Sequence, residues 1–212
     1  MTQTRRGSYH HGDLANALLT AATELARGGG PEAVVLREAA RHVGVSATAA
    51  YRHFAGHGDL IHAVKERAQA AVAASMESEL AASPPLPDPG EDAVRRLRAI
   101  GTGYIRFALT EPGLFRTAFC RTEPKEPHDL DDGWSYRSYQ LLAEVLDDLV
   151  VAGRMDPARR PYSEVPAWSA AHGLALLLLD GPLAALPEPA REAAIVRTID
   201  VIIEGICDPV TG

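Results

Sequence analysis

Apolar residues recur along most of the chain at intervals of three and four positions, the period of amphipathic α-helices. This periodicity predicts nine helices, at about 13–27, 36–43, 46–54, 59–81, 91–110, 112–120, 133–151, 164–184 and 188–206. The composition agrees, because Ala and Leu are abundant whereas aromatic residues make up only 6% of the chain. We therefore expect an all-α protein.

Glycine and proline interrupt this pattern and divide the chain. Gly28–Gly30 followed by Pro31 ends the first helix, and Gly44 marks a tight turn between the second and third helices. Residues 83–90 contain four prolines and cannot continue a helix. We expect a three-helix head, a connecting helix and a larger helical bundle, at 1–56, 57–82 and 83–212.

Charge and composition narrow the class of protein. The net charge is −7, but the first 67 residues carry a slight excess of basic side chains, which favours contact between the head and an anion such as nucleic acid. The longest apolar run, Leu174–Leu179, is too short to cross a membrane, and no signal-peptide pattern follows the N-terminal residues. Two cysteines cannot build a disulfide scaffold. We expect a cytoplasmic protein.

Residues 36–54 have the pattern of a helix-turn-helix. Ala39 and Ala40 permit a close helix crossing, Gly44 permits the turn, and Ala50 and Phe54 can both face inward. The outer face near the start of the second helix of this motif then carries Ala47, Thr48, Tyr51 and Arg52. Such side chains suit contacts with base edges and phosphates, although helical hairpins with glycine turns are also common elsewhere.

Several stretches of the head resemble the DNA-binding domain of the TetR family of bacterial transcription regulators. They are Tyr9–Leu14, Arg37–Ala40, Gly44–Ser46, Tyr51–Phe54 and Asp59–Leu60. Further along the chain, Trp168, His172 and Gly173 resemble the Trp–His–Gly signature of one subgroup of regulatory domains. The resemblance covers about residues 9–65 and 90–206. It implies a homodimer that binds double-stranded operator DNA and a small-molecule effector.

The resemblance also implies which residues contact DNA, because in the family the third helix enters the major groove and the second helix contacts DNA at its start. The corresponding residues are Arg37, Ser46, Ala47, Thr48, Tyr51, Arg52, His53 and His57. Three positions depart from the family pattern. Val35 stands where a Ser or Thr cap is usual, Ala39 replaces a larger aliphatic residue, and His57 replaces a phosphate-binding Lys.

Aromatic residues gather in three successive helices of the second half, where the family has its effector pocket. The candidate ligand-binding residues are Phe107, Leu114, Phe115, Phe119, Trp134, Tyr136, Tyr139, Trp168 and His172. Core packing is the alternative interpretation of this set. Since nearby charges are mostly acidic, the set favours a neutral or cationic, largely apolar effector.

The last two helices carry more apolar surface than one domain would be expected to cover. In the family these helices pair with their copies in a four-helix interface. The candidate dimer residues are Leu174, Leu177, Leu178, Ile195, Ile199, Ile202 and Ile206.

Catalytic motifs are not visible in the sequence: we find no nucleophile–base pair, phosphate-binding loop or set of residues with metal-ligand spacing. We therefore predict no catalytic residue, no metal and no cofactor. The function expected is that of a DNA-binding transcription regulator, a repressor released from its operator by a small molecule. Val35 and His57 motivate an alternative, a helical small-molecule-binding protein with weak or lost DNA binding.

Overall fold

The computed structural model of the protein describes residues 11–122 and 135–207. Within these ranges the chain forms nine α-helices and no strand, as the sequence predicts. The α-helices are α1 (His11–Gly29), α2 (Leu36–Val43), α3 (Ala47–Ala50), α4 (His57–Ala82), α5 (Pro89–Thr110), α6 (Pro112–Ala118), α7 (Arg137–Val151), α8 (Glu164–Leu179) and α9 (Glu188–Ile206). Two short 3-10 helices, η1 (Pro31–Ala33) and η3 (Pro157–Arg159), lie in the connections.

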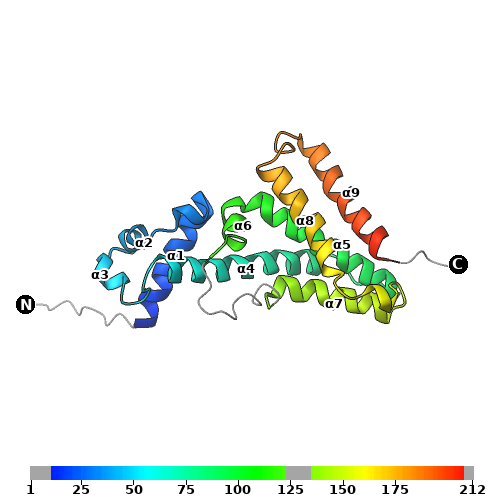
Figure 1. The fold of residues 1–212 in the computed structure, drawn as a ribbon, viewed down its shortest axis with the longest axis horizontal. Helices are drawn as coiled ribbons and strands as arrows, with labels where there is room; N and C mark the ends of the chain where they lie inside the picture. The colour runs from blue at the N-terminus through cyan, green and yellow to red at the C-terminus, as the bar shows by residue number, and fades with distance from the viewer. Residues whose placement is uncertain (1–10, 123–134, 208–212) are drawn as a thin grey trace, which may run out of the picture.

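The molecule is elongated, with α1, α2 and α3 forming a head at one end (Figure 1). Helix α4 runs from the head through the middle of the molecule, and α8 and α9 stand out from the body as a side-by-side pair. Because α4 contacts α1 of the head and also α5, α6 and α7, it joins the head to the body. It begins two residues before and ends one residue after the helix predicted at 59–81.

Small residues let the helices of the head pack closely. Ala39 and Ala40 of α2 are buried, and α2 packs against α1, whose Leu18 is also buried. Ala39, the departure from the family pattern, therefore lies in the core of the head, where a short side chain permits close approach. Gly44 ends α2 with a φ of 77°, a conformation that side-chain-bearing residues rarely adopt.

The third helix is shorter than predicted, because α3 ends at Ala50 whereas the sequence pattern extends to 54. The amides of His53 and Phe54 both donate to the carbonyl oxygen of Ala50, at 2.9 and 3.1 Å, so the helix closes in a tight turn. This turn places Phe54 in the core, as predicted. Tyr51 and Arg52 consequently lie on the turn, outside the core.

Two helices of the body also differ from their predicted bounds. Helix α7 begins at Arg137 because Tyr136 before it has extended backbone angles. Helix α8 ends at Leu179, five residues before the predicted end, because the backbone of Gly181 turns back tightly against Leu177. None of the helices in the described ranges combines the length and apolarity that a membrane span requires.

The pair α8–α9 has an inner and an outer apolar face, and this corrects the predicted dimer residues. Helix α5 packs against both helices and covers their inner face. Five of the predicted dimer residues are therefore buried within their own chain: Leu174, Leu178, Ile195, Ile199 and Ile206. Ile202 is half-buried, whereas Leu177 is 43% exposed. The outer face also exposes apolar residues that the sequence analysis did not select, namely Leu176, Val196 and Val201.

Candidate DNA-binding face and ligand cavity

Backbone and side-chain hydrogen bonds hold the junction between α2 and α3. The amide of Val45 donates to the carbonyl oxygen of Ala40 at 3.0 Å, which closes the turn after α2. Ser46 then begins α3 as its N-cap, since its hydroxyl accepts a hydrogen bond from the amide of Ala49 at 3.2 Å. Ser46 therefore has a structural role in the turn, whatever else it contacts.

The predicted DNA-binding residues lie mostly on the surface. Arg37 is exposed in the first turn of α2, Thr48 is exposed on α3, and Tyr51 and Arg52 are exposed on the turn that follows. Tyr51 is 46% exposed, so it is not a buried anchor of the hairpin. Ala47 and His53 are half-buried at the edge of this group, and His57 is exposed at the first position of α4.

The first turn of α2 lacks the usual side-chain cap. Val35 occupies the N-cap position with extended backbone angles and makes no capping hydrogen bond. The Val35 side chain is also exposed, so its packing contributes little to the stability of this turn. The departure noted in the sequence thus leaves the first amide groups of α2 without a side-chain acceptor.

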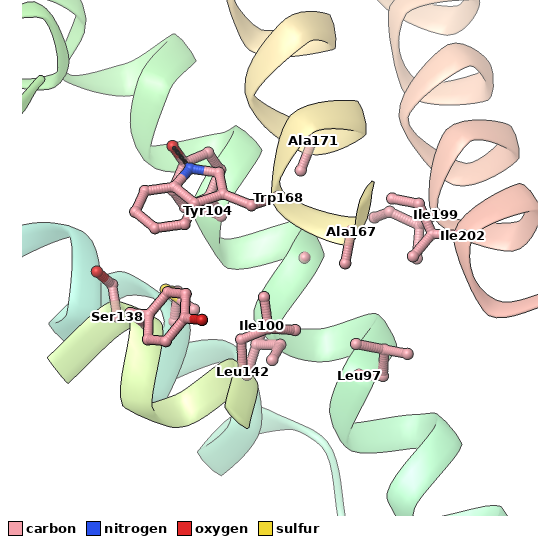
Figure 2. Close-up of a pocket in the computed structure, with 13 residues that line it drawn as sticks. Leu97, Ile100, Tyr104, Ser138, Leu142, Ala167, Trp168, Ala171, Ile199 and Ile202 are labelled. Atoms are coloured by element: carbon pink, nitrogen blue, oxygen red, sulfur yellow. Dashed lines mark hydrogen bonds between the residues drawn. The ribbon is translucent and has the colours of Figure 1, made fainter. Parts of the chain in front are cut away.

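A cavity of about 50 Å³ lies between α4, α5, α7, α8 and α9. Figure 2 shows Tyr104 and Trp168 on one side of this space and Ile199 and Ile202 of α9 on the other. Its lining residues are Met76, Leu97, Ile100, Gly101, Tyr104, Ser138, Tyr139, Leu142, Ala167, Trp168, Ala171, Ile199 and Ile202.

The predicted ligand-binding residues divide into three groups around this cavity. Tyr139 and Trp168 line it. Five others do not: Phe107, Leu114 and Phe115 are buried core residues, and Phe119 and His172 pack beside the cavity. Tyr136 instead donates a hydrogen bond to Glu66 on the surface, at 3.0 Å. Trp134 lies outside the described residues.

Tyr104 is a cavity residue that the sequence analysis missed. Its hydroxyl oxygen accepts a hydrogen bond from Nε1 of Trp168 at 3.0 Å, and the hydroxyl proton is then directed at Nδ1 of His172, 2.8 Å away. Burial raises the pKa of the Tyr104 hydroxyl far above its ordinary value, although the Trp168 hydrogen bond opposes this shift. Burial likewise lowers the pKa of His172, so the neutral imidazole needed as an acceptor is favoured.

This polar group is continuous with an aromatic cluster on α6. The ring centroids of Phe115 and Phe119 lie 5.4 and 4.9 Å from that of His172. Phe119 also meets Trp168 at 6.0 Å. Because these side chains are closely packed, a shift of Trp168 at the cavity wall would displace Phe119, the C-cap of α6.

Comparison with known families accounts for both halves of this arrangement. Residues 18–64 match the family described as bacterial regulatory proteins, tetR family, and residues 97–202 match the tetracyclin repressor-like C-terminal domain. The chain belongs to the TetR family. It is thus a DNA-binding transcription regulator of a family that is not enzymatic. The Trp–His–Gly subgroup is not confirmed by the C-terminal match.

Several solved structures share the fold. A protein of unknown function from Rhodococcus sp. RHA1 is 24% identical, with a TM-score of 0.76 over 96% of this chain and 100% of that one. TetR-family regulators from Marinobacter aquaeolei VT8 and Shewanella sp. PV-4 are 19% and 14% identical, with TM-scores of 0.65 and 0.64. These two alignments each cover 92% of this chain and 96% and 99% of the other chain. No curated protein sequence matches the chain significantly.

The described residues offer this TetR-family protein no metal centre. No group of three His, Cys, Asp or Glu side chains within 11–122 and 135–207 lies close enough to hold an ion.

Proposed function

We propose that the protein is a homodimeric transcription repressor, whose heads bind operator DNA and release it when a small molecule occupies the cavity. The observation that carries the DNA-binding part is the joint exposure of Thr48, Tyr51 and Arg52 at α3, the helix that enters the major groove in this family. Each group suits a distinct contact. The Thr48 methyl group can meet a thymine methyl group, and Tyr51 and Arg52 can reach phosphates or base edges.

Two further residues extend this face. Arg37 projects from the first turn of α2 and can pair with a guanine edge or a phosphate. His57, at the start of α4, is proposed as a phosphate contact in place of the family's lysine. The head, 1–56, would then bind DNA, 57–82 would connect it to the body, and 83–212 would bind ligand and partner.

The outer face of α8 and α9 supports a homodimer. It presents Leu176 and Leu177 from one helix and Val196 and Val201 from the other, all substantially exposed. Burial of such a side chain contributes about 1.5–3 kcal/mol, and a two-fold arrangement buries the same face on both copies. These four residues replace the buried members of the predicted set as the proposed dimer contacts.

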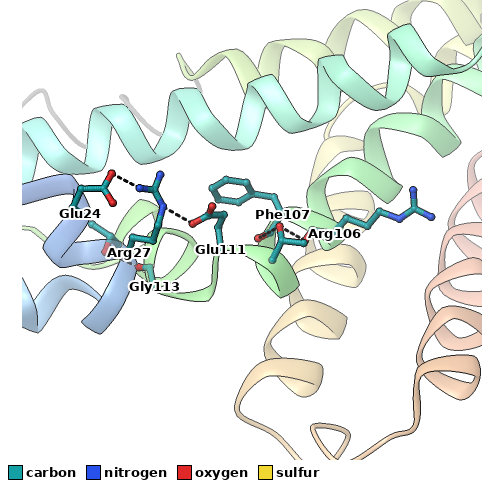
Figure 3. A network of polar contacts seen from close by, with 8 residues as sticks. Glu24, Arg27, Arg106, Phe107, Glu111 and Gly113 are labelled. Atoms are coloured by element: carbon teal, nitrogen blue, oxygen red, sulfur yellow. Dashed lines mark hydrogen bonds and ion pairs between the residues drawn. The ribbon is translucent and has the colours of Figure 1, made fainter. Parts of the chain in front are cut away.

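Helix α6 supports a structural connection between the cavity and the head, because hydrogen bonds to neighbouring helices hold both of its ends. At its start, Nε of Arg27 in α1 donates to the carboxylate of Glu111 at 2.8 Å, while Arg27 also pairs with Glu24 (Figure 3). At its end, Lys65 and Gln69 of α4 donate to the carbonyl oxygens of Cys120 and Ala118, at 3.2 and 2.7 Å.

A ligand beside Trp168 would act on α6 through Phe119 and His172, and α6 would act on the head through α1 and α4. For this to release DNA, the ligand must bind with different affinity to the two conformations of the protein that differ in the arrangement of the head.

We also keep the Trp–His–Gly subgroup as a proposal, since Trp168 and His172 both bond to Tyr104.

Competitive binding to genomic DNA fragments tests the proposal. The full-length protein should select specific duplex fragments, and its affinity should fall steeply with salt because phosphate contacts release counterions. Selection of no fragment, together with ligand binding, would favour the alternative of a small-molecule-binding protein with lost DNA affinity. The uncapped start of α2 at Val35 is the observation that motivates that alternative.

A further inference from the structure

The wall of the cavity carries no charged side chain among the described residues. The basic groups on neighbouring helices are held outside it by ion pairs. Arg106 pairs with Glu79 and Glu192, and Arg116 pairs with Asp180. A ligand that carries a charge would therefore lose its hydration on entry without gaining a counter-charge, which is strongly unfavourable.

Tyr104, Trp168 and Ser138, three of the polar residues on the wall, are already bonded within the protein. Tyr104 is engaged with Trp168 and His172. The Ser138 hydroxyl group is directed at Oε1 of Gln69, although their separation of 3.5 Å makes this a weak interaction. Recognition of an occupant must therefore come mainly from shape and apolar contact.

The size of the cavity limits the occupant further. The cavity volume of about 50 Å³ is enough for several water-sized groups but not for a large ligand. This is the scale of a single ring or a short chain. It is far below the pockets of about 300–1,000 Å³ that hold large ligands.

Two glycines on α5 show that part of this space is not required by helix packing. A Cβ at Gly103 would lie under 3.0 Å from the backbone of Met76, so Gly103 is needed for the close contact of α5 with α4. A Cβ at Gly101 would meet Ile199 at 3.5 Å, an ordinary van der Waals distance. Glycine inside a helix is unfavourable, yet alanine would fit at position 101, and Gly101 lines the cavity.

We propose that the cavity binds a small, uncharged, predominantly apolar molecule the size of one aromatic ring, and that Gly101 keeps open the space it occupies. The proposal rests on the proposed function only in making this molecule the effector. It narrows the expectation from the sequence, since a cationic effector would find no acidic side chain on the wall.

Four probes of similar shape and different charge test the chemical class. They are toluene, benzyl alcohol, benzoate and benzylamine, each added to the full-length protein at neutral pH while the melting temperature is measured. Toluene and benzyl alcohol should raise the melting temperature in a concentration-dependent way, and the two ions should not. A shift with benzoate or benzylamine equal to that with toluene would overturn the assignment, and so would the absence of any shift with toluene.

Two glycine-to-alanine variants test the place of binding. Gly101→Ala should weaken toluene binding at least tenfold while the melting temperature of the free protein stays the same or rises. Gly28→Ala is the matched control, because Gly28 lies in the head and a Cβ there meets nothing within 4 Å. It should bind toluene like the wild type. Unchanged toluene binding by Gly101→Ala would place the ligand elsewhere and overturn the proposal.

The same probes separate this inference from the proposed function. If toluene binds in the cavity but leaves affinity for a selected DNA fragment unchanged, ligand-controlled release fails and the assignment of the cavity stands. If benzoate alone binds and releases DNA, the regulator is confirmed and the inferred ligand class is wrong.

Discussion

The backbone of Gly113, at the start of α6, lies against the carbonyl oxygen of Ala26 in α1, so close that a Cβ on Gly113 would approach it to under 3.0 Å. Where two helices pack, their side chains usually separate the two backbones. At Gly113 there is no room for a side chain. At this point the head and the body therefore meet through main chain, which cannot repack in the way a flexible side chain does.

Gly113→Ala should consequently destabilise the protein. The added methyl group meets backbone atoms of α1, and overpacking of this kind costs about 1–3 kcal/mol. Urea unfolding measures the change in the free energy of unfolding. Gly205→Ala in α9, where a Cβ meets nothing within 4 Å, is the control and should be no less stable than the wild type. Equal stabilities for the two variants would contradict the described contact.

Tyr51→Ala should remove most of the affinity for a selected DNA fragment without loss of helix content. Tyr51 is exposed, so its truncation leaves no cavity, and the proposed DNA contacts are lost with its ring and hydroxyl group. Fluorescence anisotropy with labelled DNA and circular dichroism measure the two quantities. Tyr162→Ala is the control, because Tyr162 is also exposed but lies between η3 and α8, in the body. Wild-type DNA affinity in Tyr51→Ala would refute the assignment of the face.

Val196→Glu should convert the proposed dimer to monomers. The substitution places a charge on the apolar face that the proposed dimer buries, which is unfavourable. Sedimentation should give about twice the chain mass for the wild type and the chain mass for the variant. Val151→Glu, at the exposed end of α7, should sediment like the wild type. Ile202→Glu is unsuitable, because Ile202 lines the cavity and its replacement would also disturb the body.

His172 should make the protein less stable in acid. Burial lowers its pKa in the folded state below the ordinary 6.5, so the unfolded chain binds more protons in the acid range. The stabilisation by the neutral imidazole is fully present above pH 6.5 and is lost as the pH falls through the folded pKa. His172→Gln should therefore show a flatter fall of unfolding free energy below pH 6.5 than the wild type does. Parallel curves for the two proteins would exclude this role.

Val35→Thr should stabilise the head. Thr has nearly the shape of Val but adds a hydroxyl group that can accept a hydrogen bond from the first turn of α2, and a good N-cap contributes about 1 kcal/mol. Chemical denaturation measures this gain. Val151→Thr, at the end of α7, provides the same chemical change without an N-cap position and should give no such increase.

The fold could be predicted from the sequence because its elements are encoded locally. Apolar spacing and glycine or proline breaks place the helices, and the bounds of α4 agree with the pattern to within two residues. The errors lie at helix ends that depend on tertiary contacts. Helix α8 is different, because it stops before the local break at Gly181 and Pro182, while the apolar pattern runs on through Leu183 and Ala184 and therefore places the end too late.

The candidate site was harder to predict, because periodicity identifies an apolar face but not what covers it. Leu174 and Leu177 look alike in the sequence, yet only the first faces α5 and the core. Tyr104 falls on the same helical face as aliphatic core residues of α5, and only its hydrogen bonds to two residues of α8 distinguish it from them. By contrast, most of the residues proposed for the DNA-binding face lie within 46–57, so a local sequence pattern could select them, and Thr48, Tyr51 and Arg52 are exposed together.

Helix α9 contributes Ile199 and Ile202 to the cavity and Val196 and Val201 to the outer face. The occupant of the cavity and the partner protomer would therefore contact opposite sides of α9. By thermodynamic linkage, if ligand binding changes the affinity of the two protomers for each other, dimerisation must change the affinity for the ligand by the same factor. Ligand affinity should then vary with protein concentration, so that the amount of regulator in the cell sets the threshold at which it responds.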